Sequence, residues 1–151
     1  MALEYQLYIS TDSSASHLLE AIHDQFNLPW SQDHMFLDPF GVQVSALACG
    51  QSRREAFVES FGFRFDVAVH FRLANELDER REGYLTMLTV VVGLLQQEAG
   101  QAVLLFNDEI ILLQRFDGDL ALNLDWQTWQ KQGVDLVTLP YRMQSLPSPL
   151  L

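Results

Sequence analysis

The stretch LTMLTVVVGLL, from Leu85 to Leu95, carries no charged residue and lies within a helical pattern that runs from Asn75 to Gly100. It is 11 residues long, well below the ~20 apolar residues that a bilayer-spanning helix needs, so it predicts a buried core helix. Asn75 is placed to cap this helix and Gly100 to end it. Because the second half of the pattern is apolar on nearly all sides, we expect a sheet and a further element to cover it.

Two glycines, Gly83 and Gly93, interrupt this helical pattern. A glycine in a helix interior costs about 1 kcal/mol relative to alanine. We therefore expect each glycine to mark a turn where the helix is in close contact with another part of the chain.

Alternating apolar and polar residues predict β-strands on both sides of the helix. The strands before it are expected at residues 3–10, 42–49 and 63–73, with a further short strand at 34–38 as an alternative to a loop. After Gly100, the segments AVLLFN (102–107), IILLQRF (110–116) and DLALN (119–123) are separated by turn residues and predict a three-strand meander. Since the strand at 63–73 is polar on one side, we expect an antiparallel sheet with one solvated face.

Signals at helix ends predict up to three shorter helices. The first covers residues 15–26. The second begins at a capping box formed by Ser52 and Glu55 and ends at Gly62. A third is expected at residues 125–133.

Together these patterns predict an α+β fold in a single domain over residues 1–139. Its mostly antiparallel sheet of about six strands packs against one long buried helix and two or three shorter helices. A chain of 151 residues can build such a core without disulfides, since roughly 68–70% of the unfolded surface is buried at this length. Residues 140–151 contain three prolines and are expected to form an extended C-terminal tail.

Charge narrows the classes of partner. Twenty acidic residues stand against nine basic ones, of which only Lys131 is a lysine. Phosphate backbones are bound by clusters of Lys and Arg, so nucleic acid is not an expected partner. The negative field suits a cationic protein partner, while an acidic balance also serves simply to keep a domain in solution.

Cysteine usage and the N-terminus point to the cytoplasm. The single cysteine, Cys49, excludes an internal disulfide and fits a reducing compartment. Residues 1–10 lack the basic region and apolar core of a signal peptide. We therefore expect a cytoplasmic protein with no membrane partner.

Few residues form a pattern typical of a metal site or a catalytic site. Glu20, His23 and Asp24 have the spacing of metal ligands on a helix, but no second motif accompanies them, so a solvated helix face is the favoured interpretation. Cys49 lacks an activating pattern and is interpreted as a small buried residue. We expect no catalytic residue, no metal and no cofactor, and a protein that is not an enzyme.

Two surfaces remain as candidates for function. Arg64, Asp66, His70 and Arg72 share the polar side of one strand, where they could carry acid–base chemistry under a cleft or form weak ion pairs on a solvated face. Two tryptophans close to acidic turns are typical of a protein-binding hot spot, although they could also cap one end of the core. The candidate interface consists of Glu109, Asp117, Asp119, Asp125, Trp126 and Trp129.

Five segments carry a family resemblance: MALEY at 1–5, GFRFDVAVHFRL at 62–73, EGYLTML at 82–88, QAVLLFNDE at 101–109 and LALNLDW at 120–126. They resemble the swarming-inhibition (Sit-type) immunity proteins of myxobacteria and other bacteria. Such small proteins are encoded beside polymorphic toxins and protect the producing cell from its own or its siblings' toxin. The resemblance covers most of residues 1–126 and implies a role without implying catalytic residues.

The resemblance implies an immunity protein that binds a cognate toxin domain and blocks it by stoichiometric complex formation. In this hypothesis the two tryptophans anchor the toxin and the four carboxylates steer a cationic toxin face. One alternative is a small-ligand-binding protein or enzyme that uses the polar sheet face around His70. Another is a structural or adaptor subunit whose tail docks in a partner chain.

Overall fold

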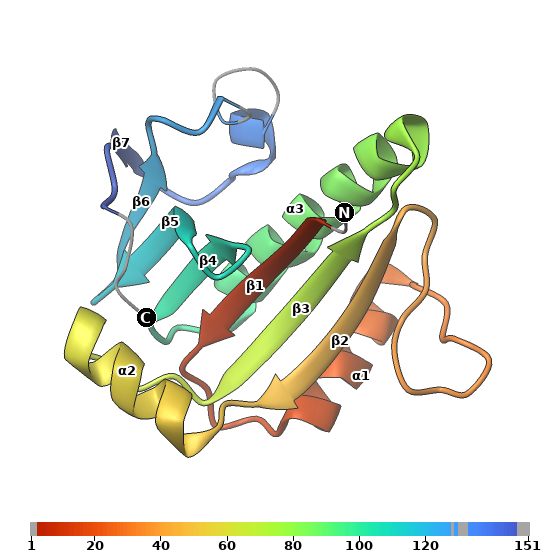
Figure 1. The fold of residues 1–151 in the computed structure, drawn as a ribbon, viewed down its shortest axis with the longest axis horizontal. Helices are drawn as coiled ribbons and strands as arrows, with labels where there is room; N and C mark the ends of the chain where they lie inside the picture. Colours follow the sequence, from red (N-terminus) through yellow and green to blue (C-terminus); the bar gives the residue numbers. More distant parts are fainter. Residues whose placement is uncertain (1–2, 128, 130–132, 148–151) are drawn as a thin grey trace.

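A single sheet organises the molecule. The structure is a computed structural model that describes residues 3–127, 129 and 133–147. Within these residues seven strands form one sheet in the order β2-β3-β1-β4-β5-β6-β7 (Figure 1). Neighbouring strands are antiparallel except β6 and β7, which are parallel. The strands are β1 (Leu3–Ile9), β2 (Val42–Ala48), β3 (Val67–Leu73), β4 (Ala102–Phe106), β5 (Ile110–Phe116), β6 (Asp119–Asn123) and β7 (Arg142–Gln144).

Helices cover the two faces of the sheet unequally. The first face packs against α1 (Ala15–Phe26) and α3 (Leu77–Gln97), as Figure 1 shows. The opposite face is covered in part by α2 (Gln51–Phe61), and a short 3₁₀ turn, η1 (Gly133–Leu136), contacts α3. The predicted α+β domain, with a mostly antiparallel sheet, one long helix and shorter ones, is confirmed.

The long helix is α3, and its second half forms the centre of the main core. Met87, Leu88, Val91 and Leu94 are all buried against the sheet or α1. Its first turn is exposed, in keeping with Asp78 and Glu79 at the positive end of the helix dipole. Most of the charge-free stretch is therefore buried, whereas Leu85 at its start is 38% exposed.

Both glycines of α3 lie at points of close contact, as predicted. A Cβ at Gly83 would lie 2.0 Å from the carbonyl oxygen of Gly41. A Cβ at Gly93 would lie 2.3 Å from the ring of Phe26, at the end of α1. The loop before β2 and the helix α1 are therefore fixed against α3 by the lack of side chains there.

The predicted ends of α3 are wrong. The N-cap is Glu76, not Asn75, and it makes no side-chain capping hydrogen bond. The helix ends at Gln97, and Gly100 lies beyond it. Instead of a terminal glycine, Arg115 of β5 donates hydrogen bonds to carbonyl oxygens at this end of the helix.

Other boundaries also differ from the prediction. The strand expected at 63–73 begins only at Val67, and residues 34–38 contribute only a single-residue bridge to β2 through Leu37. The helix α2 starts at Gln51 after Gly50, so Ser52 lies inside the helix and is not its cap. The helix expected at 125–133 lies partly outside the described residues.

The sheet does not have one fully solvated face. Tyr8 points away from the main core, yet it is buried because its ring packs 4.4 Å from that of Phe57 on α2. Gln6 is also buried, and its side-chain oxygen accepts a hydrogen bond from the Asp108 backbone N–H. Part of this face stays open to solvent, where Gln43 and Leu47 of β2, Arg72 of β3 and Glu4 of β1 are exposed.

Part of the expected C-terminal tail belongs to the sheet. Residues 142–144 form β7, parallel to β6, and Leu146 is buried in the second core. In the described part of the chain, no helix is both long and apolar enough to cross a membrane.

Candidate functional site

The two tryptophans proposed as anchors have different environments. Trp129 is 1% exposed, and its indole N–H donates to the Leu112 carbonyl at 2.8 Å. Trp126 is partly buried, packs edge-on against Tyr5 and donates to the Tyr84 hydroxyl at 2.9 Å. Trp129 therefore belongs to the core and cannot anchor a partner without leaving it, which corrects its expected place on the surface.

The four carboxylates of the candidate interface lie at two ends of the sheet. Asp117 and Asp119 lie at the turn between β5 and β6, whereas Glu109 lies at the turn between β4 and β5. Asp125 follows the far end of β6 and so lies at the Glu109 end. These ends are separated by the length of β5, about 20 Å for seven residues. The structure does not bring the four carboxylates into one patch.

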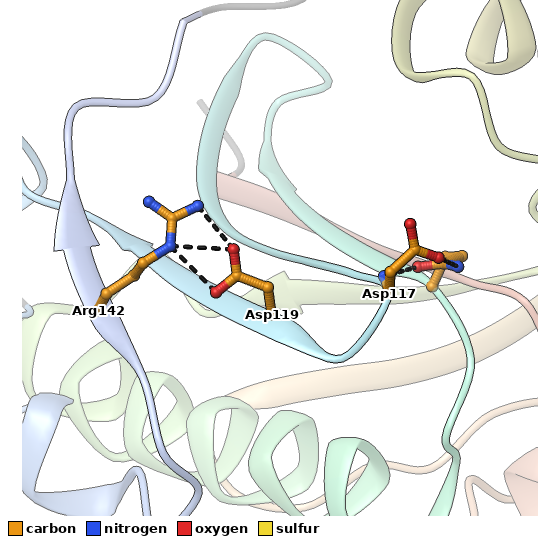
Figure 2. A network of polar contacts seen from close by, with 4 residues as sticks. Asp117, Asp119 and Arg142 are labelled. Carbon is orange, nitrogen blue, oxygen red and sulfur yellow. Dashed lines mark hydrogen bonds and ion pairs between the residues drawn. The ribbon is translucent and has the colours of Figure 1, made fainter.

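At the β5–β6 turn, both carboxylates have partners within the chain (Figure 2). The Arg142 Nε and Nη2 atoms donate to the Asp119 carboxylate at 2.9 to 3.0 Å. These hydrogen bonds hold the pKa of Asp119 below its usual range. Asp117 has a positive φ and exchanges two hydrogen bonds with the Gln101 side chain. These contacts join the turn to β7 through Arg142 and to the residue before β4 through Gln101.

The polar row on the third strand is split in two. Arg64 and Asp66 lie before β3, where their side chains are 3.4 Å apart and Asp66 also accepts from the Thr11 backbone N–H at 3.0 Å. His70 and Arg72 lie on β3 itself, on the open part of the sheet face. The structure thus separates the four residues into an ion pair at one end and a pair that lines a surface hollow.

That hollow has a volume of about 460 Å³ and extends from β1 across β3 and β2 to the loop before β2. Its polar residues are Glu4, Gln43, Ser45, His70 and Arg72. Its apolar rim is exposed, because Met35 is 73% and Leu47 is 61% accessible. A surface of this kind suits contact with another protein more than enclosure of a small substrate.

Beside the hollow, the edge of the sheet is only partly covered. Val44 exchanges two backbone hydrogen bonds with Leu37, at 2.8 and 2.9 Å, and the Val42 N–H donates to the Pro39 carbonyl. In an antiparallel strand these outward groups alternate with inward ones, so the N–H and C=O of Ala46 and Ala48 also point away from β3. The N–H and C=O groups of Ala46 and Ala48 form no hydrogen bond with any described residue.

Sequence reasoning missed this edge. Two signals could have indicated it: the strand sequence VQVSALA contains no charge, and residues 1–52 contain six carboxylates and no Lys or Arg. Edge strands usually carry Lys or Pro to prevent pairing with other chains. The lack of both here, next to an acidic surface, distinguishes β2 from an ordinary edge strand.

The remaining candidate residues have structural environments. Burial raises the pKa of the Cys49 thiol, with Arg54 and Arg53 opposing this effect, so the thiol is less nucleophilic at neutral pH. The His23 Nδ1 atom is 2.6 Å from the Leu28 carbonyl oxygen, and its ring packs on Trp30. Among the described residues, no three or more His, Cys, Asp or Glu side chains are grouped so as to hold a metal ion.

Comparison with known proteins identifies the family. No curated protein and no solved structure matches this chain. Residues 3–133 match the SitI3-like family, which is most of the chain and includes α1, α2, α3 and the first six strands. This match agrees with the resemblance to Sit-type immunity proteins in the sequence, and the chain belongs to the SitI3-like family.

Proposed function

We propose that this protein binds a cognate bacterial toxin domain in the cytoplasm of the producing cell and neutralises it by forming a stoichiometric complex. The observation that carries the proposal is the family match over residues 3–133, since an immunity-type family implies a toxin as partner. Protection by binding needs no catalytic group, which fits a surface of open hollows and edges.

The charge distribution supports a cationic toxin face. The formal net charge is −11, and several of the few cations are used inside the protein. Arg53 pairs with Asp108 at 3.5 Å, and Arg115 and Arg80 donate to backbone carbonyls. The field outside the molecule is therefore dominated by carboxylates, which would speed association with a basic surface and weaken it at high salt.

The carboxylates of the candidate interface fit this steering role at two separate positions. Glu109 and Asp125 act at one end of the sheet and Asp117 at the other, where Arg142 offsets the charge of Asp119. The screening length at physiological salt is about 8 Å, which is shorter than the distance between the two ends, so each end attracts a basic surface separately. Trp126, partly buried, is the one tryptophan of the pair that still offers an edge to a partner.

The test uses the toxin domain encoded by the neighbouring gene. Co-expression with this protein should restore growth, and titration of purified components by calorimetry should give a 1:1 complex. Protection should be lost once toxin exceeds the immunity protein. An enzyme that inactivates toxin would protect at far lower ratios, so protection at one part in a hundred, or lack of any complex, would contradict the proposal. An unrelated acidic protein of similar net charge serves as the control.

Replacing Glu109 and Asp125 with lysine, and separately Asp117, tests the steering role. We expect slower association with the toxin and weaker salt dependence, with little change in the dissociation rate. Equal association rates for all variants would remove these carboxylates from the proposal while leaving complex formation intact.

A further inference from the structure

The edge of β2 has backbone groups that form no hydrogen bond within the described part of the fold. The outward backbone groups of Val42 and Val44 are satisfied by residues 37–39 of the preceding loop. Those of Ala46 and Ala48 have no partner among the described residues, and Ala48 is exposed. The edge therefore offers two N–H and two C=O groups along residues 45–48, a length of about 13 Å.

The other edge of the sheet is protected. There β7 is only three residues long, carries Arg142 paired with Asp119, and lies between Pro140 and Pro147. Short edge strands with charges and nearby prolines resist further pairing. The seven-residue β2 has neither charge nor proline, so the two edges differ in the property that controls strand addition.

The surroundings of the β2 edge specify the chemistry of an added strand. On the open sheet face, the edge borders the hollow of about 460 Å³ whose exposed rim is Met35 and Leu47. On the core side, α1 packs against β2, and Glu20 and Asp24 of this helix are exposed. Side chains of a strand alternate between the two faces, so the added strand would place one set over the hollow and the other towards the acidic helix.

We propose that an extended segment of the toxin adds to the sheet as a strand beside residues 45–48 of β2. The segment alternates apolar residues, which cover Met35 and Leu47, with Lys or Arg residues, which face Glu20 and Asp24. This inference rests on the proposed function and names the surface that serves it. Backbone hydrogen bonds supply affinity in this mode of recognition, and alternate side chains supply specificity.

Charge favours a toxin segment over a second copy of this chain. Two copies joined at β2 would each bring a net charge of −11, and their acidic helices would lie on either side of the junction. Like charges brought together across an interface are unfavourable. A basic segment would instead meet exposed carboxylates on α1, while Arg72 in the hollow lies on the face that the apolar residues of the segment cover.

Amide hydrogen exchange measured by NMR, with and without the neighbouring gene's toxin domain, tests the placement. In the free protein, the amides of Ala46 and Ala48 should exchange fast, while those of Ser45 and Leu47, bonded to β3, should be protected. In the complex, Ala46 and Ala48 should become protected by roughly tenfold or more. A complex that forms without slowing these two amides overturns the inference, although the proposed function stands. Failure of the wild-type protein to bind the toxin domain refutes the proposed function instead.

A matched pair of variants gives a second readout. Ala48→Pro removes an outward N–H that is unbonded in the free protein, so the fold should be kept, as checked by circular dichroism. Ala48→Val keeps that N–H. We expect toxin affinity to fall roughly tenfold or more for Ala48→Pro and to stay within about threefold for Ala48→Val. Equal affinities for the two folded variants would show that the toxin does not pair with this edge. Protection of Ala46 and Ala48 that rises with protein concentration in the free protein would overturn the choice of occupant, because a second copy of the chain would then pair there.

Discussion

Replacing Arg115 with methionine tests what holds the C-terminal end of α3. Arg115 lies on β5 and is 7% exposed. Its guanidinium donates to the carbonyl oxygens of Leu95, Glu98 and Gly100. These carbonyls lie beyond the last hydrogen bond recorded for the helix, from Glu98 N–H to Leu94, so they depend on a donor from outside the helix.

The size of the effect follows from two opposing contributions. Burial lowers the pKa of Arg115, since the charged guanidinium has lost water, and Glu98 opposes this shift. Methionine removes that cost and keeps much of the apolar stem, but leaves three carbonyls without their donor. At about 1 kcal/mol net for each acceptor, the loss in unfolding free energy is about 3 kcal/mol. For a domain of this size, that corresponds to a fall in Tm of about 6–12 °C.

Urea denaturation followed by far-ultraviolet circular dichroism measures this loss. The matched control is Arg142→Met, which removes an arginine that pairs with the carboxylate of Asp119 at the surface. Exposed ion pairs contribute little, so the control should unfold close to the wild-type midpoint. A loss below about 1 kcal/mol for Arg115→Met, or equal losses for both variants, would refute the view that Arg115 holds the helix end.

Three further predictions concern the same core and its ionisable groups. Val91 is fully buried, so Val91→Asp should prevent folding, because an unpaired buried charge costs several kcal/mol; a native circular dichroism spectrum with a cooperative transition would contradict the central place of α3. Gly83→Ala should lower the Tm despite the better helix propensity of alanine, because the new Cβ would lie 2.0 Å from the Gly41 carbonyl oxygen; a gain of about 1 kcal/mol would show that this contact is loose. Burial, the largest cause, raises the pKa of both Tyr5 and Tyr8 above the usual tyrosine value. The stability that their neutral forms provide is present in full below about pH 10 and falls as the pH rises above it, because the unfolded chain loses these protons first. Unfolding midpoints between pH 8 and pH 11 measure this fall, and unchanged midpoints would contradict it.

Local patterns made much of the fold predictable. The meander β4–β5–β6 was predicted almost to the residue, because strand alternation and turn residues are both short-range signals. The buried character of α3 followed from eleven residues without charge. The strand β7 could not be found in this way, because it has three residues and pairs with β6 across about twenty intervening positions.

The ends of α3 could not be predicted from capping residues in the sequence. Gly100 has the position of a terminal glycine, yet its carbonyl oxygen accepts from Arg115, fifteen residues further on. The sequence contains no local sign of this contact, because it depends on β5 passing the helix end. Trp129 was ambiguous for the same reason, since only the completed sheet shows that its indole lies over Leu112.

The division of the candidate carboxylates between two ends of the sheet could have been predicted from the sequence. Successive turns of a meander lie at opposite ends of its strands, so Glu109 and Asp117 could not belong to one patch once the meander was predicted. The β2 edge, in contrast, could not be identified from the sequence. The strand order shows that β2 is outermost, and the hydrogen bonds show that the preceding loop covers Val42 and Val44.

The net negative charge of the protein bears on how the uncharged edge strand β2 avoids pairing with a second copy. An open seven-residue edge exposes a protein to pairing with its own copies, and most proteins prevent this with a charge on the strand itself. Here the strand is neutral, while the net charge of the molecule is −11. Such a charge repels a second copy at long range and attracts a basic segment. In the proposed complex the acidic composition therefore has a second role besides solubility: it leaves the edge open to a basic segment of the toxin while discouraging self-association.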